Sequence, residues 1–327
     1  MSRRWKVLLC GYYGMGNAGD EFLASASIAL LERCGLKRDE IVMLSGDTAE
    51  SERVHGVRAF DRWNWREIVI AAKNSETLLL GGGGIFQDSS GLLSPWYYWG
   101  VMRIASLCGC RLWAAGQSVG PLRSPVSRAL ARNAFSLCSA VTVRDERSHE
   151  FLKRGALLAD DLVLTLPCGA SERKGNGVLV NFRPCGGLER KAAQDFSALE
   201  WTRGRSVIGV AMSDEDARLM ETLQREKIIR LDDLRLCTVE NWSETFSDGE
   251  YAWGMRLHFG VFCLKRGIPC TLVPYDPKVS DFDVRWGAKQ WPDCSRPEEW
   301  SLADELDVAI STTITAFADS FRNAVRP

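Results

Sequence analysis

The sequence predicts an α/β protein made of two doubly wound, Rossmann-like domains. Short apolar stretches of the strand type alternate along the chain with helical stretches. Many of the strands end in turns rich in glycine and polar residues, as in open parallel sheets. The length of 327 residues suits two domains of ordinary size. We expect the two domains to face each other across a central cleft, the usual place for a ligand.

The N-terminal domain is placed at residues 1–170 and the C-terminal domain at residues 171–327. The segment Cys168–Asn176 is small and polar, so it is the predicted linker. A closing helix is expected within Ser301–Val325, and it is the one part of the second domain that we allow to pack back on the first.

In the first half, strand, loop and helix repeat about five times, which is typical of a mostly parallel sheet. The expected strands are Trp5–Cys10, Ile41–Leu44, Glu76–Leu80, Arg111–Ala115 and Ala140–Val143. The expected helices are about Phe22–Cys34, Asn64–Asn74, Tyr97–Leu107 and Arg123–Cys138.

The second half repeats the alternation. The expected strands are Val178–Phe182, Val207–Met212, Ile228–Leu231 and Cys270–Val273. The expected helices are Leu188–Arg203, Asp214–Lys227 behind an N-capping Ser213, and an apolar helix after His258 that Gly267 and Pro269 end. Residues 238–252 are polar and show no clear pattern.

Composition and charge exclude several classes of protein. A net charge of −1 gives no global attraction to nucleic acid or anionic lipid. The eleven cysteines form no CxxC pair, which favours thiols in a reducing compartment over a metal site. The N-terminal apolar run is too short for a signal peptide, and no window reaches the ~20 apolar residues of a membrane helix. We therefore expect a cytoplasmic protein, with at most peripheral contact at the inner face of the membrane.

A glycine-rich turn follows the first strand, at residues 11–21. The letters GxGxxG of dinucleotide-binding proteins match Gly14, Gly16 and Gly19. Asp20 and Glu21, however, lie where a pyrophosphate would sit, so a nicotinamide-dependent oxidoreductase is disfavoured. Either the glycines allow a turn and Asp20 caps the helix, or the loop lines a cleft and offers Asn17, Asp20 or Glu21 to the hydroxyl groups of a ligand.

A run of four glycines follows the third expected strand, at residues 81–84. Because each glycine has an ordering cost, the run must permit close approach of a ligand or of a neighbouring element. We expect Gly82 and Gly83 to face a ligand together with Gln87 and Asp88.

The stretch Trp253–Lys278 holds the strongest candidates for chemistry. Arg256 and His258 lie at the start of the apolar helix, where backbone N–H groups and the helix dipole favour an anion. Lys278 lies in a loop just past the next strand, beside Tyr275 and Asp276. Two cations and an imidazole are therefore expected to converge on one small acidic ligand. The alternative is that each side chain is structural or solvated.

Seven stretches, in order along the chain, carry a family resemblance. They are GYYGMGNAGDE (11–21), GGGGIFQD (81–88), GQSVGPL (116–122), VRDERS (143–148), NFRP (181–184), GMRLHFGVF (254–262) and YDPKV (275–279). Together they resemble the polysaccharide pyruvyl transferase family, and most closely the bacterial enzymes that modify cell-wall polymers used for S-layer anchoring. Phe259 departs from the small residue expected after His258, and residues 285–300 match nothing.

The resemblance implies a fold like that of type-B glycosyltransferases and the transfer of pyruvate from phosphoenolpyruvate to two hydroxyls of a sugar. His258 would be the general acid, and Arg256 and Lys278 would bind the anionic donor. Further substrate-binding residues implied are Arg144, Arg183, Tyr275, Asn17, Asp20, Gly82, Gly83, Gln87 and Asp88. Arg144 has an alternative, a simple ion pair with Asp145. The acceptor would be a hexosamine or hexose, often on a polyprenyl diphosphate, and no metal or cofactor is required.

Two rival functions stay open on the same fold. A glycosyltransferase that uses a nucleotide sugar would be inhibited by a nucleoside diphosphate. A non-catalytic glycan-binding protein would keep its ligand affinity without His258. The aromatic run Trp96–Trp99 suits stacking on sugar or contact with lipid, and equally a buried helix.

Overall fold

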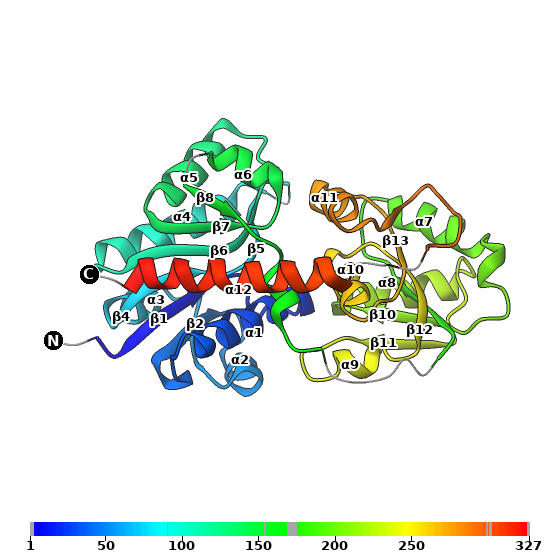
Figure 1. The fold of residues 1–327 in the computed structure, drawn as a ribbon, viewed down its shortest axis with the longest axis horizontal. Coiled ribbons are helices and arrows are strands. Elements are labelled where there is room, and N and C mark those ends of the chain that lie inside the picture. Colours follow the sequence, from blue (N-terminus) through cyan, green and yellow to red (C-terminus); the bar gives the residue numbers. More distant parts are fainter. Residues whose placement is uncertain are drawn as a thin grey trace. The chain divides into compact units, whose positions relative to one another are not determined.

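The structure, a computed structural model, describes residues 3–89, 91–153, 155–168, 175–298, 300 and 303–325. The chain divides into two compact units (Figure 1). Unit 1 consists of Met1–Met15, Asp20–Leu166 and Glu305–Pro327, and unit 2 of Gly16–Gly19 and Pro167–Asp304. Most of the predicted linker, residues 169–174, and the predicted helix start at residues 301–302 lie outside the described residues.

Unit 1 contains a parallel sheet in the order β3-β2-β1-β4-β6-β7-β8, with β5 paired to β6. The strands are β1 (Trp5–Cys10), β2 (Ile41–Ser45), β3 (Arg58–Asp61), β4 (Ser75–Leu80), β5 (Gly83–Phe86), β6 (Arg111–Val119), β7 (Cys138–Val143) and β8 (Ala156–Leu158). The order reverses at β1 and β4, whose last residues, Cys10 and Leu80, are register partners. The doubly wound arrangement predicted for the first half is therefore confirmed.

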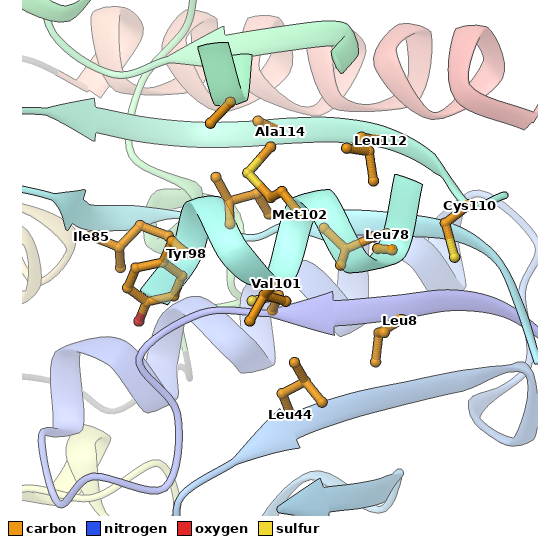
Figure 2. Close-up of a cluster of buried hydrophobic side chains, with 14 of the residues drawn as sticks. Leu8, Leu44, Leu78, Ile85, Tyr98, Val101, Met102, Cys110, Leu112 and Ala114 are labelled. Carbon is orange, nitrogen blue, oxygen red and sulfur yellow. The ribbon is translucent and has the colours of Figure 1, made fainter. Parts of the chain in front are cut away.

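Helices cover the sheet of unit 1. They are α1 (Ala18–Arg33), α2 (Thr48–His55), α3 (Trp65–Lys73), α4 (Leu93–Leu107), α5 (Pro125–Ser136) and α6 (Glu146–Leu152), with the 3-10 turns η1 (Arg38–Glu40) and η2 (Leu162–Thr165). Alternate strand residues, such as Leu8 and Leu78, point to the face where α3, α4 and α5 pack. Figure 2 shows Tyr98, Val101 and Met102 of α4 lying against these strand side chains.

The last helix, α12 (Ala303–Val325), joins unit 1 along most of its length. Phe317 and Phe321 pack on Trp113 of β6, with ring centroids 5.2 and 5.8 Å apart. Near its end, the Val325 carbonyl accepts a 2.8 Å hydrogen bond from Nη2 of Arg111. These contacts extend over about two turns of α12, so this helix packs on the sheet of unit 1.

Unit 2 repeats the winding in the order β11-β10-β9-β12-β13-β14, all parallel. Its strands are β9 (Gly177–Asn181), β10 (Val207–Ala211), β11 (Asp233–Leu236), β12 (Gly249–Gly254), β13 (Cys270–Leu272) and β14 (Lys289–Gln290). Its helices are α7 (Leu188–Ser197), α8 (Asp214–Arg225), α9 (Trp242–Thr245), α10 (Leu257–Lys265) and α11 (Pro277–Trp286), with a 3-10 turn η3 (Glu200–Thr202). The core lies between β9, β10 and β12 and the apolar faces of α7 and α8.

Several predicted boundaries are wrong. Helix α1 begins at Ala18, four residues earlier than predicted, so Asp20 lies in its first turn and is not the N-cap. The predicted strand Ile228–Leu231 does not form; the edge strand is β11, which pairs with β10 through Ile208 and Asp233. The predicted helix Leu188–Arg203 stops at Ser197. Short strands with charged ends, such as β3 and β11, carry too little apolar periodicity to be recognised from sequence.

Candidate active site

The carboxyl ends of three neighbouring strands in unit 2 carry the predicted residues. Strand β12 pairs with both β9 and β13, and Gly254 is the register partner of Asn181 on one side and Leu272 on the other. The strand order reverses between β9 and β12, which is where open α/β sheets bind their ligands. Arg183 follows β9, Arg256 and His258 follow β12, and Lys278 follows β13.

Arg256 is the N-cap residue of α10, and its guanidinium is held by a buried carboxylate. Nη2 donates to Oδ1 of Asp216 at 2.7 Å, and Nε donates to Oδ2 at 3.0 Å. Nη2 also donates to Oγ of Ser213 at 3.0 Å. Asp216 is completely buried on α8, so the ion pair fixes the plane of the guanidinium at the sheet edge.

Asn181 joins this ion pair to the sheet. Its Oδ1 accepts the backbone N–H of Arg256 at 2.9 Å, and its Nδ2 donates to the Val210 carbonyl at 2.8 Å. The same nitrogen lies 3.4 Å from Oδ2 of Asp216. The ends of β9, β10 and β12 are thus tied by one buried polar network around Arg256.

His258 lies in the first turn of α10 and meets the first turn of α1. A Cβ atom on Gly19 would be 2.1 Å from Nδ1 of His258, so the imidazole rests on the backbone of that glycine. The same turn is attached to β10, because the Ala18 N–H donates to the Met212 carbonyl at 2.9 Å. Residues 16–19 therefore belong to unit 2, although the sequence placed the whole loop in the N-terminal domain.

Lys278 lies on a helix, which corrects the predicted loop. Asp276 is the N-cap of α11, and its Oδ1 accepts the backbone N–H of Lys278 at 3.1 Å. Nζ of Lys278 is 3.6 Å from Oδ2 of Asp276. The ammonium group is therefore carried by the first turn of α11, where the helix dipole also favours anions.

Arg183 and Tyr275 contact each other. Nη1 of Arg183 donates to the Tyr275 hydroxyl at 2.9 Å, and the guanidinium lies 4.8 Å from the ring centroid. This contact joins the loop after β9 to the loop after β13. The two residues were predicted separately, from different motifs, and the structure brings them together.

The loop after β1 has a structural explanation for several of its polar residues. Oδ1 of Asn17 accepts the Gly19 N–H at 3.2 Å, which places Asn17 at the start of α1. Glu21 accepts the Gly14 N–H at 2.7 Å and lies 2.9 Å from Nε2 of the buried His55. Asp20 lies beside Gly83, whose added Cβ would be 3.5 Å from its Oδ1.

The run of four glycines accommodates neighbouring elements. A Cβ on Gly81 would be 2.2 Å from the Tyr13 hydroxyl oxygen, and a Cβ on Gly82 would be 2.8 Å from Cδ2 of Leu23. Gly83 adopts a φ of 125°, which favours glycine, and begins strand β5. The glycine run was expected to permit close approach of either a ligand or a neighbouring element. The contacts of Gly81 and Gly82 support the neighbouring element.

The polar residues after this run are engaged locally. Both carboxylate oxygens of Asp88 accept backbone N–H groups, from Arg123 at 2.8 Å and from Ser124 at 2.8 Å. Burial raises the pKa of Asp88, but these hydrogen bonds outweigh it, so the net pKa is lowered. Gln87 accepts a hydrogen bond from the Ser89 hydroxyl. Asp88 therefore fixes the loop that leads into α5.

Arg144 forms a buried ion pair, but the predicted partner is wrong. Its Nη1 contacts Oδ2 of Asp161, and both side chains are almost completely buried in unit 1. Asp145 instead caps α6, where its Oδ1 accepts the Ser148 N–H at 2.8 Å. The pattern of adjacent opposite charges was misleading because the Asp145 carboxylate is engaged as the N-cap of α6.

An aromatic surface surrounds Arg62 in unit 1. The buried guanidinium lies 4.8 to 5.6 Å from the ring centroids of four aromatic residues, Tyr12, Trp63, Tyr97 and Tyr98. Trp63 is 57% exposed, and Trp65 and Trp96 are about half exposed. Within the predicted run Trp96–Trp99, therefore, one side chain faces solvent and Tyr98 is core.

Sequence reasoning missed Asp216, Asn181 and Gly19 as residues of the site. Asp216 was read only as part of the predicted helix Asp214–Lys227, and Gly19 only as a letter of a discounted motif and of the stretch 11–21. Gly19 gave no helix signal, because the helix was expected to begin only at about Phe22, whereas α1 begins at Ala18. In the described part of the chain, no group of three or more His, Cys, Asp or Glu is arranged to hold a metal ion. Within the same residues, no helix has the length and apolarity to span a bilayer.

Solved structures that resemble this chain share its fold at very low sequence identity. The UDP-GlcNAc 2-epimerase of Methanocaldococcus jannaschii is 10% identical, with a TM-score of 0.57 over 95% of this chain and 92% of its own. MnaA of S. aureus, solved with UDP, is 9% identical, with a TM-score of 0.57 over 98% and 94%. Sucrose-phosphate synthase of Thermosynechococcus elongatus is 12% identical, with a TM-score of 0.55 over 98% and 94%. The predicted fold, two Rossmann-like domains as in type-B glycosyltransferases, is confirmed.

Comparison at the level of sequence is more specific. Curated protein sequences gave no match. The sequence profile of the polysaccharide pyruvyl transferases matches residues 17–277, which is well over half of the chain and includes Arg256 and His258. The chain therefore belongs to the polysaccharide pyruvyl transferase family.

Proposed function

We propose that this protein transfers pyruvate from phosphoenolpyruvate to two hydroxyls of one sugar in a cell-wall polysaccharide, forming a ketal and releasing phosphate. One observation carries the proposal: three adjoining strand ends of unit 2 bear cations and an imidazole. These residues are Arg183, Arg256, Lys278 and His258. A donor with a carboxylate and a phosphate needs such a set, because each anionic group must exchange its water for charged donors.

Arg256 and Lys278 are the anion-binding residues in this proposal. The pairing with Asp216 holds the Arg256 guanidinium in one orientation, which lowers the ordering cost of binding a planar carboxylate or a phosphate. Lys278 supplies a point charge from the first turn of α11. Arg183 is fixed by Tyr275 and borders the same strand ends.

His258 is the proposed general acid. Proton transfer from the imidazolium to the methylene carbon of phosphoenolpyruvate makes a methyl group and leaves C2 with cationic character. The first sugar hydroxyl then bonds to C2 and gives up its proton. Next, the C2–O bond to phosphate breaks, and the second hydroxyl closes the ketal. One hydroxyl proton restores His258, and the other leaves with the phosphate, so atoms and charges balance.

The aromatic surface of unit 1 supports a sugar as the acceptor. Trp63, Trp65 and Tyr97 offer ring faces beside the loop after β1, because Arg62 joins Gly11 and Tyr98 by hydrogen bonds of 2.9 and 3.0 Å. Aromatic faces suit the apolar faces of pyranose rings and also the region near lipid headgroups. We propose an amino-sugar precursor linked to a polyprenyl diphosphate, modified at the inner face of the membrane.

The test is incubation of the protein with phosphoenolpyruvate and a panel of glycosyl acceptors, both free and polyprenyl-diphosphate-linked. We expect phosphate release that depends on the acceptor and a product whose mass includes one pyruvate ketal. Consumption of a nucleotide sugar in place of phosphoenolpyruvate would instead support a glycosyltransferase. Binding of the glycan without turnover in any combination would support a non-catalytic protein.

A further inference from the structure

Glycine is the only amino acid that fits at position 19 without displacing a neighbouring group. A Cβ at this position would lie 2.1 Å from Nδ1, 2.9 Å from Cγ and 3.0 Å from Cε1 of His258. Real Cβ atoms do not approach other atoms so closely, so any other amino acid must displace the ring or the backbone. The glycine is needed for space and not for its backbone conformation, since it lies within α1 and has no positive φ.

The backbone at Gly19 has little freedom to move. The Ala18 N–H donates to the Met212 carbonyl at the end of β10, at 2.9 Å. The Gly19 N–H donates to Oδ1 of Asn17 at 3.2 Å. The bond to Met212 would break if the turn moved back to make room for a methyl group, and the bond to Asn17 holds the turn in its present conformation. The imidazole, which turns about two side-chain torsions, is therefore the group that moves.

The backbone that carries His258 is fixed, because Leu257 and Phe259 on either side of it are buried in unit 2. We propose that Gly19 is a positioning residue that seats the imidazole of His258 between the first turns of α1 and α10. The seat sets the direction in which the ring presents its protons. The packing of Gly19 against His258 does not depend on the proposed function, whereas its expected effect on turnover rests on that function.

The primary test is Gly19→Ala in the full chain. We expect phosphate release from phosphoenolpyruvate to fall about a hundredfold, because a shift of about 1 Å in a catalytic group has an effect of that size. The KM for phosphoenolpyruvate should change little, since Arg256 and Lys278 are untouched. The chain has three histidines, so imidazole NMR signals are readable and His258→Ala identifies the relevant one. In Gly19→Ala, the His258 signals should move while those of His149 stay in place.

A double-mutant cycle separates the seat from a general loss of structure. In the His258→Ala background the ring is absent, so Gly19→Ala should cause no further loss of activity and should raise the unfolding temperature, because alanine is favoured over glycine in helices. Gly100→Ala is the matched control, since this glycine of α4 has only ordinary contacts, with Trp65 at 3.5 Å. It should raise the unfolding temperature whether or not His258 is present.

The outcomes distinguish the two proposals. Unchanged His258 signals and full activity in a folded Gly19→Ala protein would overturn the seat. If Gly19→Ala fails to fold, folding of the double variant supports the seat, and failure of both variants overturns it. If the signals move and the two sites couple in stability, but the unaltered protein never consumes phosphoenolpyruvate, the seat stands and the proposed function fails.

Discussion

The two sheets of this protein share a strand order but differ in what their carboxyl edges carry. In unit 2 the segments that follow β9, β12 and β13 carry Arg183, His258 and Lys278, the last two in the first turns of α10 and α11. In unit 1 the corresponding reversal point, between β1 and β4, is filled by glycines packed on Tyr13 and Leu23. Two arginines of unit 1, Arg62 and Arg144, lie inside it. One topology therefore carries a set of cations at this edge in unit 2, whereas in unit 1 the edge carries packed glycines with the Asp20 carboxylate beside Gly83.

This difference assigns a chemistry to each unit. A dianionic donor gains from fixed cations, whereas a sugar gains from ring faces and uncharged polar groups. Unit 2 is the proposed donor unit, and unit 1 the proposed acceptor unit. Residues 16–19 are an exception, since this short piece of the N-terminal segment supplies the seat of His258 in unit 2.

The largest expected effect is that of His258→Ala. Loss of a general acid lowers turnover by about 10²–10⁴-fold, so phosphate release should fall by that factor while the unfolding temperature stays close to that of the unaltered protein. His149→Ala, on α6 of unit 1, is the matched control and should keep full activity. Equal activity in the two variants would contradict the role of His258 as the general acid.

The second largest effect is expected for Asp216→Asn. A neutral amide leaves the Arg256 guanidinium without its buried counter-charge, which costs about 3–5 kcal/mol in comparable buried pairs. Chemical denaturation would measure the loss, and the KM for phosphoenolpyruvate should rise as Arg256 loses its orientation. Asp161→Asn, which breaks the buried pair with Arg144 in unit 1, should destabilise to a similar degree. A stable Asp216→Asn protein with unchanged KM would contradict the positioning of Arg256.

A pH-dependent loss of stability is expected in unit 2. Burial raises the pKa of Asp283 on α11 to about 8, and the nearby Gln290 side chain lowers it only in part. Because the folded-state pKa exceeds the unfolded value, the carboxyl group favours folding fully below about pH 4, and this contribution is lost as the pH rises through 8. At ~1.4 kcal/mol per pKa unit, about 6 kcal/mol is the upper bound of this contribution.

Asp283→Asn isolates this group, since the amide cannot ionise. Unfolding temperatures of the two proteins should be close at acidic pH and should diverge between pH 4 and 8, with the variant more stable at alkaline pH. Parallel curves over that range would mean that Asp283 is ionised in the folded protein at neutral pH.

The smallest effect is expected in unit 1, from Trp63→Ala. Loss of one stacking ring weakens binding by about 0.5–1.5 kcal/mol, so the KM for the glycan acceptor should rise up to about tenfold and the KM for phosphoenolpyruvate should not change. Leu107→Ala is the control, since Leu107 is 80% exposed at the other end of α4. A rise in the donor KM alone would reverse the assignment of the two units.

Much of the site was predictable because its motifs are local. Arg256 and His258 were placed at a helix start by Gly254 before them and the apolar run after them, and both lie there. Lys278 was assigned to a loop because Pro277 was not read as the first residue of a helix capped by Asp276. For Arg144, the alternative to substrate binding was an ion pair with its neighbour Asp145, and the structure pairs it with Asp161 instead.

The sequence by itself determined the alternation of strands and helices, the two-domain fold and the presence of cations after particular strands. These features follow from periodicity, caps and turns, which are properties of neighbouring residues. Only the tertiary structure decided that Asp216 holds Arg256, that Tyr275 holds Arg183 and that Gly19 lies beneath His258. Such contacts join segments distant along the chain, and they depend on strand order and register, which no local pattern encodes.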